Sequence, residues 1–150
     1  MIYVARGIPT DEGATRLLRE SHALMEALFP PEANNYLDIE ALLADHIQFF
    51  IATDGKATLG TAALSDQGDY AEVKSMFVAK EARGHGVGRM LLDRLEHEAR
   101  LLGHSALKLE TGDRLHAARL LYARAGFKDC AAFGDYRPEP SSVYMEKVLL

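Results

Sequence analysis

Glu72-Val-Lys-Ser-Met-Phe-Val78 is followed, after a short turn, by Arg83-Gly-His-Gly-Val-Gly-Arg89 and then by a long amphipathic segment. The first part alternates and contains valine and phenylalanine, a pattern that predicts a β-strand. From Val87 to Leu102 the apolar residues recur with the spacing of one helix face. The glycines of this segment therefore lie where a strand leads into the first turn of a helix.

A helix that begins at such a loop has an anion-binding end. The backbone N–H groups of its first turn lack partners within the helix and carry partial positive charge. Gly84, Gly86 and Gly88 have no Cβ, so that an anionic group can approach the backbone closely. Arg83 and Arg89 add positive charge on either side. The pattern indicates a ligand that carries a diphosphate.

The spacing of the glycines distinguishes this loop from two other phosphate-binding loops. A Rossmann fingerprint reads Gly-x-Gly-x-x-Gly, whereas this chain has Gly84-x-Gly86-x-Gly88. The Gly-Lys-Ser/Thr of a Walker loop is absent. A glycine-rich turn that serves only tight packing is the structural alternative.

The composition limits the classes of protein to consider. A chain of 150 residues, with 48% apolar and 26% charged residues, fits one domain over residues 1–150. Its net charge of −5 argues against partners such as nucleic acid or acidic membranes. The single cysteine, Cys130, excludes an internal disulfide, and the histidines lack metal-ligand spacing, so we expect no metal site. No apolar run has a membrane-spanning length and no signal-peptide pattern begins the chain, so we expect a cytoplasmic protein.

The rest of the chain supplies further strands and helices around this segment. The expected strands cover residues 2–5, 48–53, 57–65, 70–78, 106–111, a segment from 127, and 142–148. Expected helices run from Thr10, as N-cap, to Pro30, over 39–45 with Asp38 as cap, from about 86 to 102, and from 115 to 126. This order predicts a mixed sheet with helices on both faces, of the α/β or α+β class.

Two motifs carry a resemblance to a known family. The spacing Arg-x-x-Gly-x-Gly within 83–88 resembles the acetyl-CoA pyrophosphate loop of the GNAT superfamily of N-acetyltransferases. About thirty residues later, Ala118-x-x-Leu121-Tyr122-x-x-x-Gly126-Phe127 resembles the second signature of that family. The order of elements is similar over nearly the whole chain. One departure is Leu115, which stands where the family often has an asparagine.

The resemblance implies a mostly antiparallel sheet of six to seven strands, with about four helices on its two faces. This sheet would be splayed open between the strand that ends at Val78 and the strand over 106–111. Acetyl-CoA would lie in that opening as co-substrate, with its pantetheine along the strand edge and its pyrophosphate on the amides of the glycine loop. The implied cofactor-binding residues are Met76, Phe77, Val78, Arg83, Gly84, His85, Gly86, Val87, Gly88 and Arg89.

The resemblance also implies roles in acetyl transfer to an amine. Tyr122 matches the tyrosine that protonates the departing sulfur, and a backbone N–H near Met76 or Phe77 would stabilise the oxyanion. The general base is left open between Glu72, on the strand before the loop, and Glu110, on the facing strand. Strict alternation would place Glu72, Lys74, Met76 and Val78 on the face that lines the opening.

The walls of the acceptor site would come from the loop after the first helix and from a late loop. The expected substrate-binding residues are Asn35, Tyr36 and Tyr136. The acceptor could then be an amino acid, a small amine or a peptide, and a homodimer through the sheet edge or the first helix is one arrangement that the residues leave open. A protein that binds acyl-CoA without turnover, as a sensor or interaction partner, is the alternative function.

Overall fold

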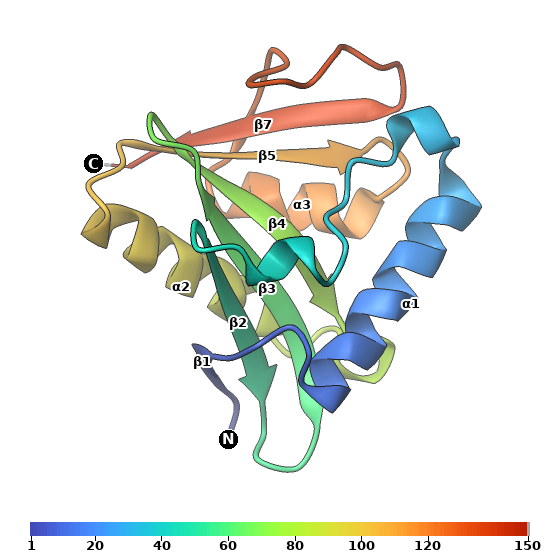
Figure 1. Cartoon of the computed structure of the whole chain (residues 1–150), viewed down its shortest axis with the longest axis vertical. Coiled ribbons are helices and arrows are strands. Elements are labelled where there is room, and N and C mark those ends of the chain that lie inside the picture. Colours follow the sequence, from blue (N-terminus) through green and yellow to red (C-terminus); the bar gives the residue numbers. More distant parts are fainter. Residues whose placement is uncertain (150) are drawn as a thin grey trace.

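The computed structural model describes residues 1–149 and contains seven strands and three α-helices (Figure 1). The strands are β1 (Tyr3–Arg6), β2 (Ile47–Thr53), β3 (Thr58–Asp66), β4 (Ala71–Val78), β5 (Ala106–Gly112), β6 (Lys128–Cys130) and β7 (Ser142–Val148). The helices are α1 (Glu12–Leu28), α2 (Val87–Leu101) and α3 (His116–Arg124), with short 3₁₀ turns at Pro31–Ala33, Ala41–Leu43 and Lys80–Ala82.

All seven strands belong to one sheet, in the order β1-β2-β3-β4-β5-β7-β6. Every neighbouring pair is antiparallel except β4 and β5, which are parallel. Only two residue pairs join these two strands, Ala71 with Leu107 and Glu72 with Lys108. Beyond them β4 and β5 diverge, as their directions in Figure 1 show. The predicted mixed, splayed sheet is confirmed.

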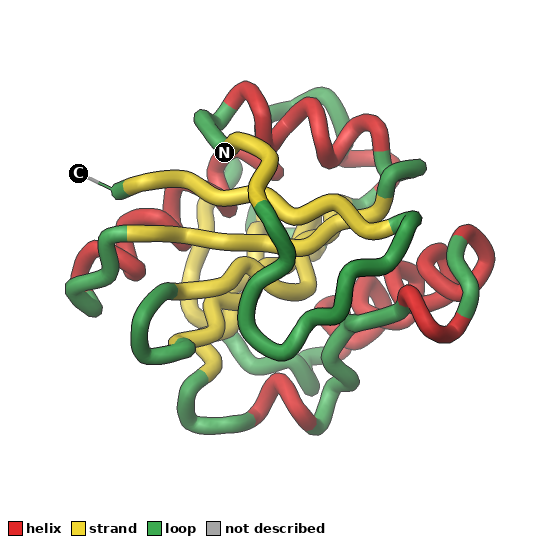
Figure 2. The backbone as a smooth tube through the Cα atoms, turned by 90° about the horizontal axis from the view of Figure 1, so that it is seen from above, coloured by secondary structure: helices red, strands yellow, loops and turns green. Residues whose placement is uncertain are grey.

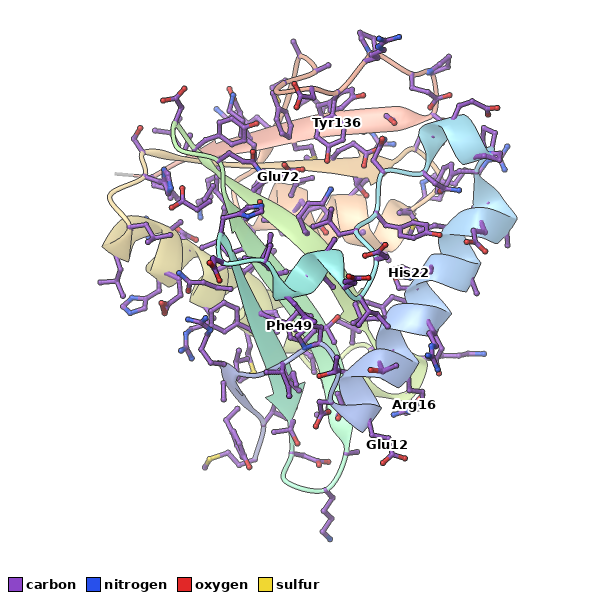
Figure 3. The ribbon with its side chains drawn as sticks, viewed as in Figure 1. Glu12, Arg16, His22, Phe49, Glu72 and Tyr136 are labelled. Carbon is purple, nitrogen blue, oxygen red and sulfur yellow. The ribbon has the colours of Figure 1, made fainter. Side chains whose placement is uncertain are left out.

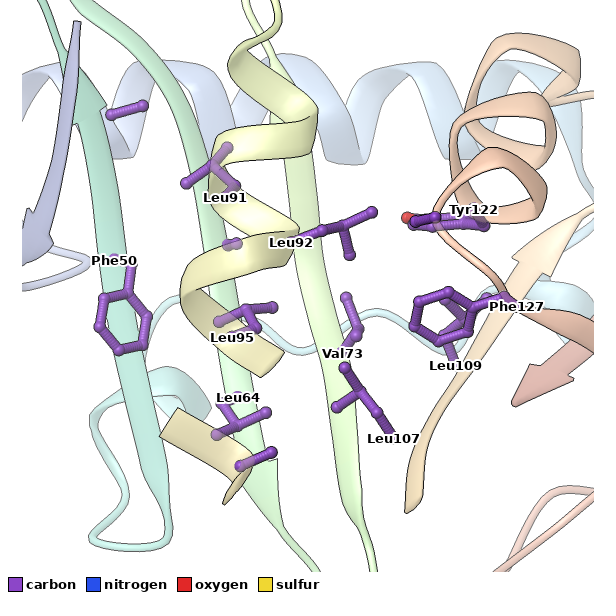
Figure 4. Close-up of a cluster of buried hydrophobic side chains, with 14 of the residues drawn as sticks. Phe50, Leu64, Val73, Leu91, Leu92, Leu95, Leu107, Leu109, Tyr122 and Phe127 are labelled. Atoms are coloured by element: carbon purple, nitrogen blue, oxygen red, sulfur yellow. The ribbon is translucent and has the colours of Figure 1, made fainter. Parts of the chain in front are cut away.

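Helices cover both faces of this sheet (Figure 2). The cross-strand register places Phe50, Ala62 and Leu64 on one face, where they pack against α2. On the opposite face, Phe49 and Ala63 pack against α1. Helix α3 covers β5 on the same side as α2, and together they bury a continuous core (Figure 4). Burial of this apolar surface is the main force that holds the layers together.

A β-bulge in β4 contradicts the strict alternation expected for this strand. Lys74 pairs with Ala63 and Phe77 pairs with Thr61, so that two residues of β4 stand opposite one residue of β3. Ser75, at the bulge, has a φ of 53°, which is uncommon for a residue other than glycine. The extra residue shifts the side chains that follow it. Val78 therefore lies on the face toward α2, not on the face of Glu72.

The first two predicted helices also need correction. Helix α1 has Asp11, not Thr10, as its N-cap, since the Asp11 carboxylate accepts a hydrogen bond from the Ala14 amide at 3.2 Å. The segment predicted as a helix over 39–45 forms only one 3₁₀ turn, although Asp38 does accept a bond from the Ala41 amide. The described residues thus contain three α-helices where about four were expected. None of these helices is long and apolar enough to cross a membrane.

Candidate active site

A pocket of about 120 Å³ lies where β4 and β5 separate. Helix α1, the loop after it, and α3 complete its walls. The residues that line it are Ser21, Met25, Phe29, Ala33, Asn34, Asn35, Tyr36, Val73, Lys74, Ser75, Met76, Glu110, Thr111, Gly112, Leu115, Ala118, Tyr122, Ser141 and Ser142. The divergence of two strands therefore creates a site that draws residues from both halves of the sheet.

The edge of β4 that faces this pocket is unpaired after Glu72, because β5 has already turned away. Ser75 and Met76 also have no partner residue on β3, owing to the bulge. The buried Ser75 hydroxyl has no hydrogen-bond partner among the described residues, and it lies in the pocket wall. Unpaired strand edges offer backbone N–H and C=O groups to an extended ligand. Met76 lines the pocket as expected, whereas Val78 faces α2.

The glycine-rich loop has an open anion-binding end. Gly84 and Gly86 have φ values of +81° and +80°, and a Cβ placed on either would meet no atom within 4 Å. Gly86 is the N-cap of α2 and supplies no side chain, so the first N–H groups of the helix are left for a ligand. Gly88 differs, because a Cβ there would lie 2.7 Å from Leu121 of α3. The absence of a side chain at Gly88 therefore also allows α2 and α3 to pack closely.

The other residues of this loop divide into buried and exposed positions. Val87 is buried beneath the helix start, whereas His85 is exposed. Arg89 is exposed and bonds to Asp93 at 3.0 Å. Arg83 is also exposed and lies over the Phe77 ring, with its guanidinium 6.0 Å from the ring centre. Two arginines therefore stand beside the open helix end, as expected from the sequence.

Tyr122 lines the pocket from α3 and is buried, with its ring 5.8 Å from that of Phe127 (Figure 4). Burial raises the pKa of its phenol well above the usual range, and the negative charge of Glu110 adds to this shift. The phenol is therefore protonated at neutral pH and available as a proton donor. Leu115, the N-cap of α3, makes no side-chain capping bond.

Glu110 lines the same pocket from the end of β5. Its carboxylate accepts a hydrogen bond from the Ser142 hydroxyl at 2.8 Å. Burial raises the pKa of this carboxyl, and the Ser142 bond and the nearby positive charge of Lys74 offset the rise only in part. A carboxylate with a raised pKa holds a proton more readily, which suits a general base.

Glu72, the other candidate base, lies in a second pocket. It lines a neighbouring pocket of about 270 Å³, formed with Asn35, Gln67, Tyr70, Gly134, Asp135 and Tyr136. Its carboxylate accepts a hydrogen bond from Tyr136 at 2.5 Å (both residues are labelled in Figure 3). The same carboxylate lies 3.5 Å from the Lys74 ammonium. The structure thus separates the two candidate bases, with Glu110 in the first pocket and Glu72 in the second.

Lys74 joins the walls of the two pockets. Its ammonium donates to the Tyr136 hydroxyl at 2.8 Å and to the backbone carbonyl of Asn35 at 3.0 Å. The two loops expected to contact the acceptor are therefore tied to β4 through one side chain. Alternation alone indicated that Lys74 shares a face with Glu72, but its hydrogen bonds to the two loops could not be predicted from a local pattern.

Tyr36 is held against α1 at the mouth of the first pocket. Its ring stacks on His22 with the ring centres 4.0 Å apart, and its hydroxyl donates to Glu26 at 2.6 Å. Tyr36 is 37% exposed, so one side of the ring remains open to a ligand. Asn35, Tyr36 and Tyr136 thus all lie at the two pockets. Within residues 1–149, no group of three or more His, Cys, Asp or Glu residues could hold a metal ion.

Comparisons with known proteins agree with this geometry. Residues 14–127 match the acetyltransferase (GNAT) family. The chain is 40% identical to an IAA acetyltransferase from Azospirillum brasilense, over 99% of this chain and 98% of the relative. A crystal structure of a proposed acyl-CoA N-acyltransferase from Klebsiella pneumoniae is 29% identical, with a TM-score of 0.82 over 100% of this chain and 99% of that one. A Thermoplasma acidophilum PaiA N-acetyltransferase in complex with coenzyme A shares the fold, with a TM-score of 0.76 and 18% identity over 99% of both chains.

Proposed function

This chain belongs to the acetyltransferase (GNAT) family, and we propose that it transfers the acetyl group of acetyl-CoA to a primary amine of a small molecule or peptide. The observation that carries this proposal is the unpaired edge of β4, which leads directly to the open N-terminus of α2. An extended chain that ends in a diphosphate fits such an edge and helix end together.

The residues present suit the parts of acetyl-CoA. Backbone groups between Val73 and Val78 would bind the pantetheine, as an added strand binds a sheet edge. The amides of residues 84–89 would bind the diphosphate, with Arg83 and Arg89 beside it. When bound, acetyl-CoA supplies an activated thioester. The amine would attack its carbonyl carbon directly, within a ternary complex.

We assign the general base to Glu110. Its carboxylate faces the pocket that also contains Tyr122, whereas the Glu72 carboxylate is engaged by Tyr136 and Lys74 in the neighbouring pocket. Glu110 would accept a proton from the acceptor ammonium, directly or through water. The neutral amine then forms a C–N bond with the acetyl group.

Tyr122 is assigned as the general acid. The C–S bond breaks as the amide forms, and the phenol of Tyr122 gives its proton to the sulfur. A backbone N–H at the bulge, near Met76 or Phe77, would stabilise the negative charge that develops on the carbonyl oxygen. The nitrogen loses two protons in all: the first goes to Glu110 before the attack, and the second leaves after the C–N bond has formed and returns, through water, to the Tyr122 phenolate. Glu110 then releases its proton to solvent, and the products are the amide and the CoA thiol.

Thermal unfolding with acetyl-CoA, CoA, ATP and NAD, each at the same excess, tests the cofactor. A ligand at about 100 times its dissociation constant stabilises the folded state by about 2.7 kcal/mol, which raises the unfolding midpoint by several degrees. We expect a shift with acetyl-CoA and CoA, and release of the CoA thiol when an amine is added. A shift only with ATP or NAD would contradict the proposal. Binding of acetyl-CoA without thiol release for any amine would favour an acyl-CoA sensor.

A further inference from the structure

The pocket at the splay contains two formally charged residues among those that line it, Lys74 and Glu110. The groups that contact Lys74 and Glu110 determine which of these two charges is available to bind an acceptor. A carboxylate on the acceptor would need a free cation, and an ammonium would need a free carboxylate. The hydrogen bonds and ion pairs of the two side chains therefore bear on the class of acceptor.

Lys74 is already engaged by groups of this protein. The side chain is 12% exposed, and its ammonium donates to the Asn35 carbonyl and the Tyr136 hydroxyl while forming an ion pair with Glu72 at 3.5 Å. Two of its three N–H donors are therefore used, and its charge is balanced by Glu72. An acceptor carboxylate would have to compete with Glu72 for this cation.

Glu110 is in the opposite situation. It forms no ion pair with any basic side chain in the described part of the chain, and its hydrogen-bond donors are neutral: the Ser142 hydroxyl at 2.8 Å and the Asn35 side chain. The nearby charge of Lys74 acts on this carboxylate but does not form an ion pair with it, so an ammonium that enters the pocket would gain a charged partner at Glu110. A second anion there would be repelled.

The neighbouring pocket has the same sign of charge. Of its lining residues, Glu72 and Asp135 are acidic and none is basic. The two pockets share Asn35, so that an acceptor lying across both would meet carboxylates at each end. Within residues 1–149, neither pocket offers an unengaged cation to bind an acceptor carboxylate.

The wall of the first pocket next to α1 and α3 contains an apolar section, beside the serines, asparagines and tyrosines that also line the pocket. Met25 and Phe29 come from the end of α1, and the Phe29 ring lies against Gly112 so closely that a Cβ there would be 2.1 Å from it. Ala33 and Ala118 line the same pocket. An apolar part of the acceptor that packs against these side chains would remove water from its own surface and from theirs. This burial of apolar surface favours binding.

We infer that the acceptor is a primary amine that has an apolar skeleton and no carboxylate, rather than a free amino acid. This inference rests on the proposed function and narrows its acceptor. Glu110 then has two roles. It is the general base, and it favours acceptors whose ammonium group has no carboxylate next to it. A peptide N-terminus or an amino-acid amide satisfies the same condition, because its carboxylate is masked.

The test compares acceptors that differ only at the carboxyl position: leucine, leucinamide and isopentylamine, followed by a series of linear alkylamines. CoA thiol release gives kcat/KM for each. We expect leucinamide and isopentylamine to exceed leucine by about 100-fold or more, since like charges brought together at a binding site cost several kcal/mol. Leucine turned over as fast as leucinamide, or no turnover of any apolar amine, would overturn the inference.

The Glu110→Gln variant checks the cause of the selection. Loss of the base lowers all rates, but the ratio of kcat/KM for isopentylamine to that for leucine should fall toward one. Glu20→Gln is the control, and it should leave the ratio as in the parent protein because Glu20 is exposed on α1, pairs with Arg16 and lines neither pocket. If the ratio of kcat/KM for isopentylamine to that for leucine stays unchanged in Glu110→Gln, Glu110 does not cause the discrimination against a carboxylate. Calorimetry with acetyl-CoA alone is independent of the acceptor, so absence of acetyl-CoA binding would mark failure of the proposed function itself.

Discussion

The hydroxyl of Tyr136 donates a hydrogen bond of 2.5 Å to the carboxylate of Glu72, although 64 positions separate the two residues in the chain. Tyr136 belongs to the loop between β6 and β7, and Glu72 lies on β4, so this bond joins a late loop to the middle of the sheet. Lys74 completes the group by bonding to the same hydroxyl. Glu72, one of the two candidate bases, therefore also connects β4 to this loop.

Replacement of Tyr136 by Phe should lower stability. It leaves the buried Glu72 carboxylate, which is 5% exposed, without its hydroxyl donor. An unsatisfied buried polar group costs about 1–3 kcal/mol, and a charged one costs more. Urea denaturation measures the free energy of unfolding. Tyr3→Phe, at a half-exposed position on β1, is the control and should change it little. Equal stability of Y136F and the parent protein would contradict the structural role of this bond.

Glu110→Gln and Glu72→Gln should separate the two candidate bases. We expect kcat/KM to fall by about 10²- to 10⁴-fold in Glu110→Gln, the usual contribution of a general base. Glu72→Gln should stay within about tenfold of the parent protein, because its carboxylate faces the neighbouring pocket. Steady-state thiol release with one amine measures both. The reverse order of effects would assign the base to Glu72.

The pH dependence of kcat/KM should report the carboxyl of Glu110. A base must be deprotonated to act, so the rate falls as the pH drops through its pKa. Burial raises this pKa from its ordinary value of 4.5, and the acid limb should therefore lie at a pH above 4.5. The same limb should be lost in Glu110→Gln and kept in Glu72→Gln. An acid limb that persists unchanged in Glu110→Gln would point to another group.

Tyr122→Phe should slow turnover without weakening CoA binding. Phenylalanine fills the same buried space beside Phe127 but has no proton to give to the sulfur. Loss of a general acid lowers kcat by about 10²- to 10⁴-fold. Isothermal titration with CoA should give a dissociation constant close to that of the parent protein. Turnover at the parental rate would remove Tyr122 from the chemistry and leave it a core residue.

Gly86→Ala should weaken acetyl-CoA binding beyond its effect on stability. Gly86 has a φ of +80°, so an L-residue there costs about 1–2 kcal/mol. Gly68→Ala is a matched control, because Gly68 has a φ of +87°, equally open surroundings and a position in the turn before β4. Both variants should lose similar stability on denaturation, while only Gly86→Ala loses acetyl-CoA affinity by calorimetry. Equal affinity in the two variants would place the diphosphate elsewhere.

The fold was predictable because its main signals are local. The apolar spacing of α2, the alternation of the strands and the glycines at turns each depend on neighbouring residues, and their order determines the sheet. The segment over 39–45 shows the limit of this reasoning, because so short a stretch cannot offset the cost of starting an α-helix and forms one 3₁₀ turn. Thr10 and Asp11 are both good N-caps, so the sequence could not decide between them.

The site was less predictable than the fold, because its contacts are distant in sequence. The bulge at Ser75 adds one residue to β4 without a glycine or proline to mark it, and the faces expected for Phe77 and Val78 are reversed. The bonds of Tyr136 and Lys74 to Glu72 depend on where a long loop returns to the sheet. Local patterns carry no information on such a return, so the sequence left Glu72 and Glu110 as equal candidates.

The two residue pairs between β4 and β5 have a consequence for the order in which substrates bind. Backbone hydrogen bonding nearly stops in the middle of the sheet, so the part that contains β1 to β4 and the part that contains β5 to β7 are joined there by little besides side-chain packing. The acceptor pocket takes its walls from both parts. Acetyl-CoA bound along the open edge would bridge them, and an amine arriving afterwards would meet a stiffer pocket. From the discontinuity of the sheet we therefore expect an ordered kinetic sequence, with the thioester binding first and the amine second.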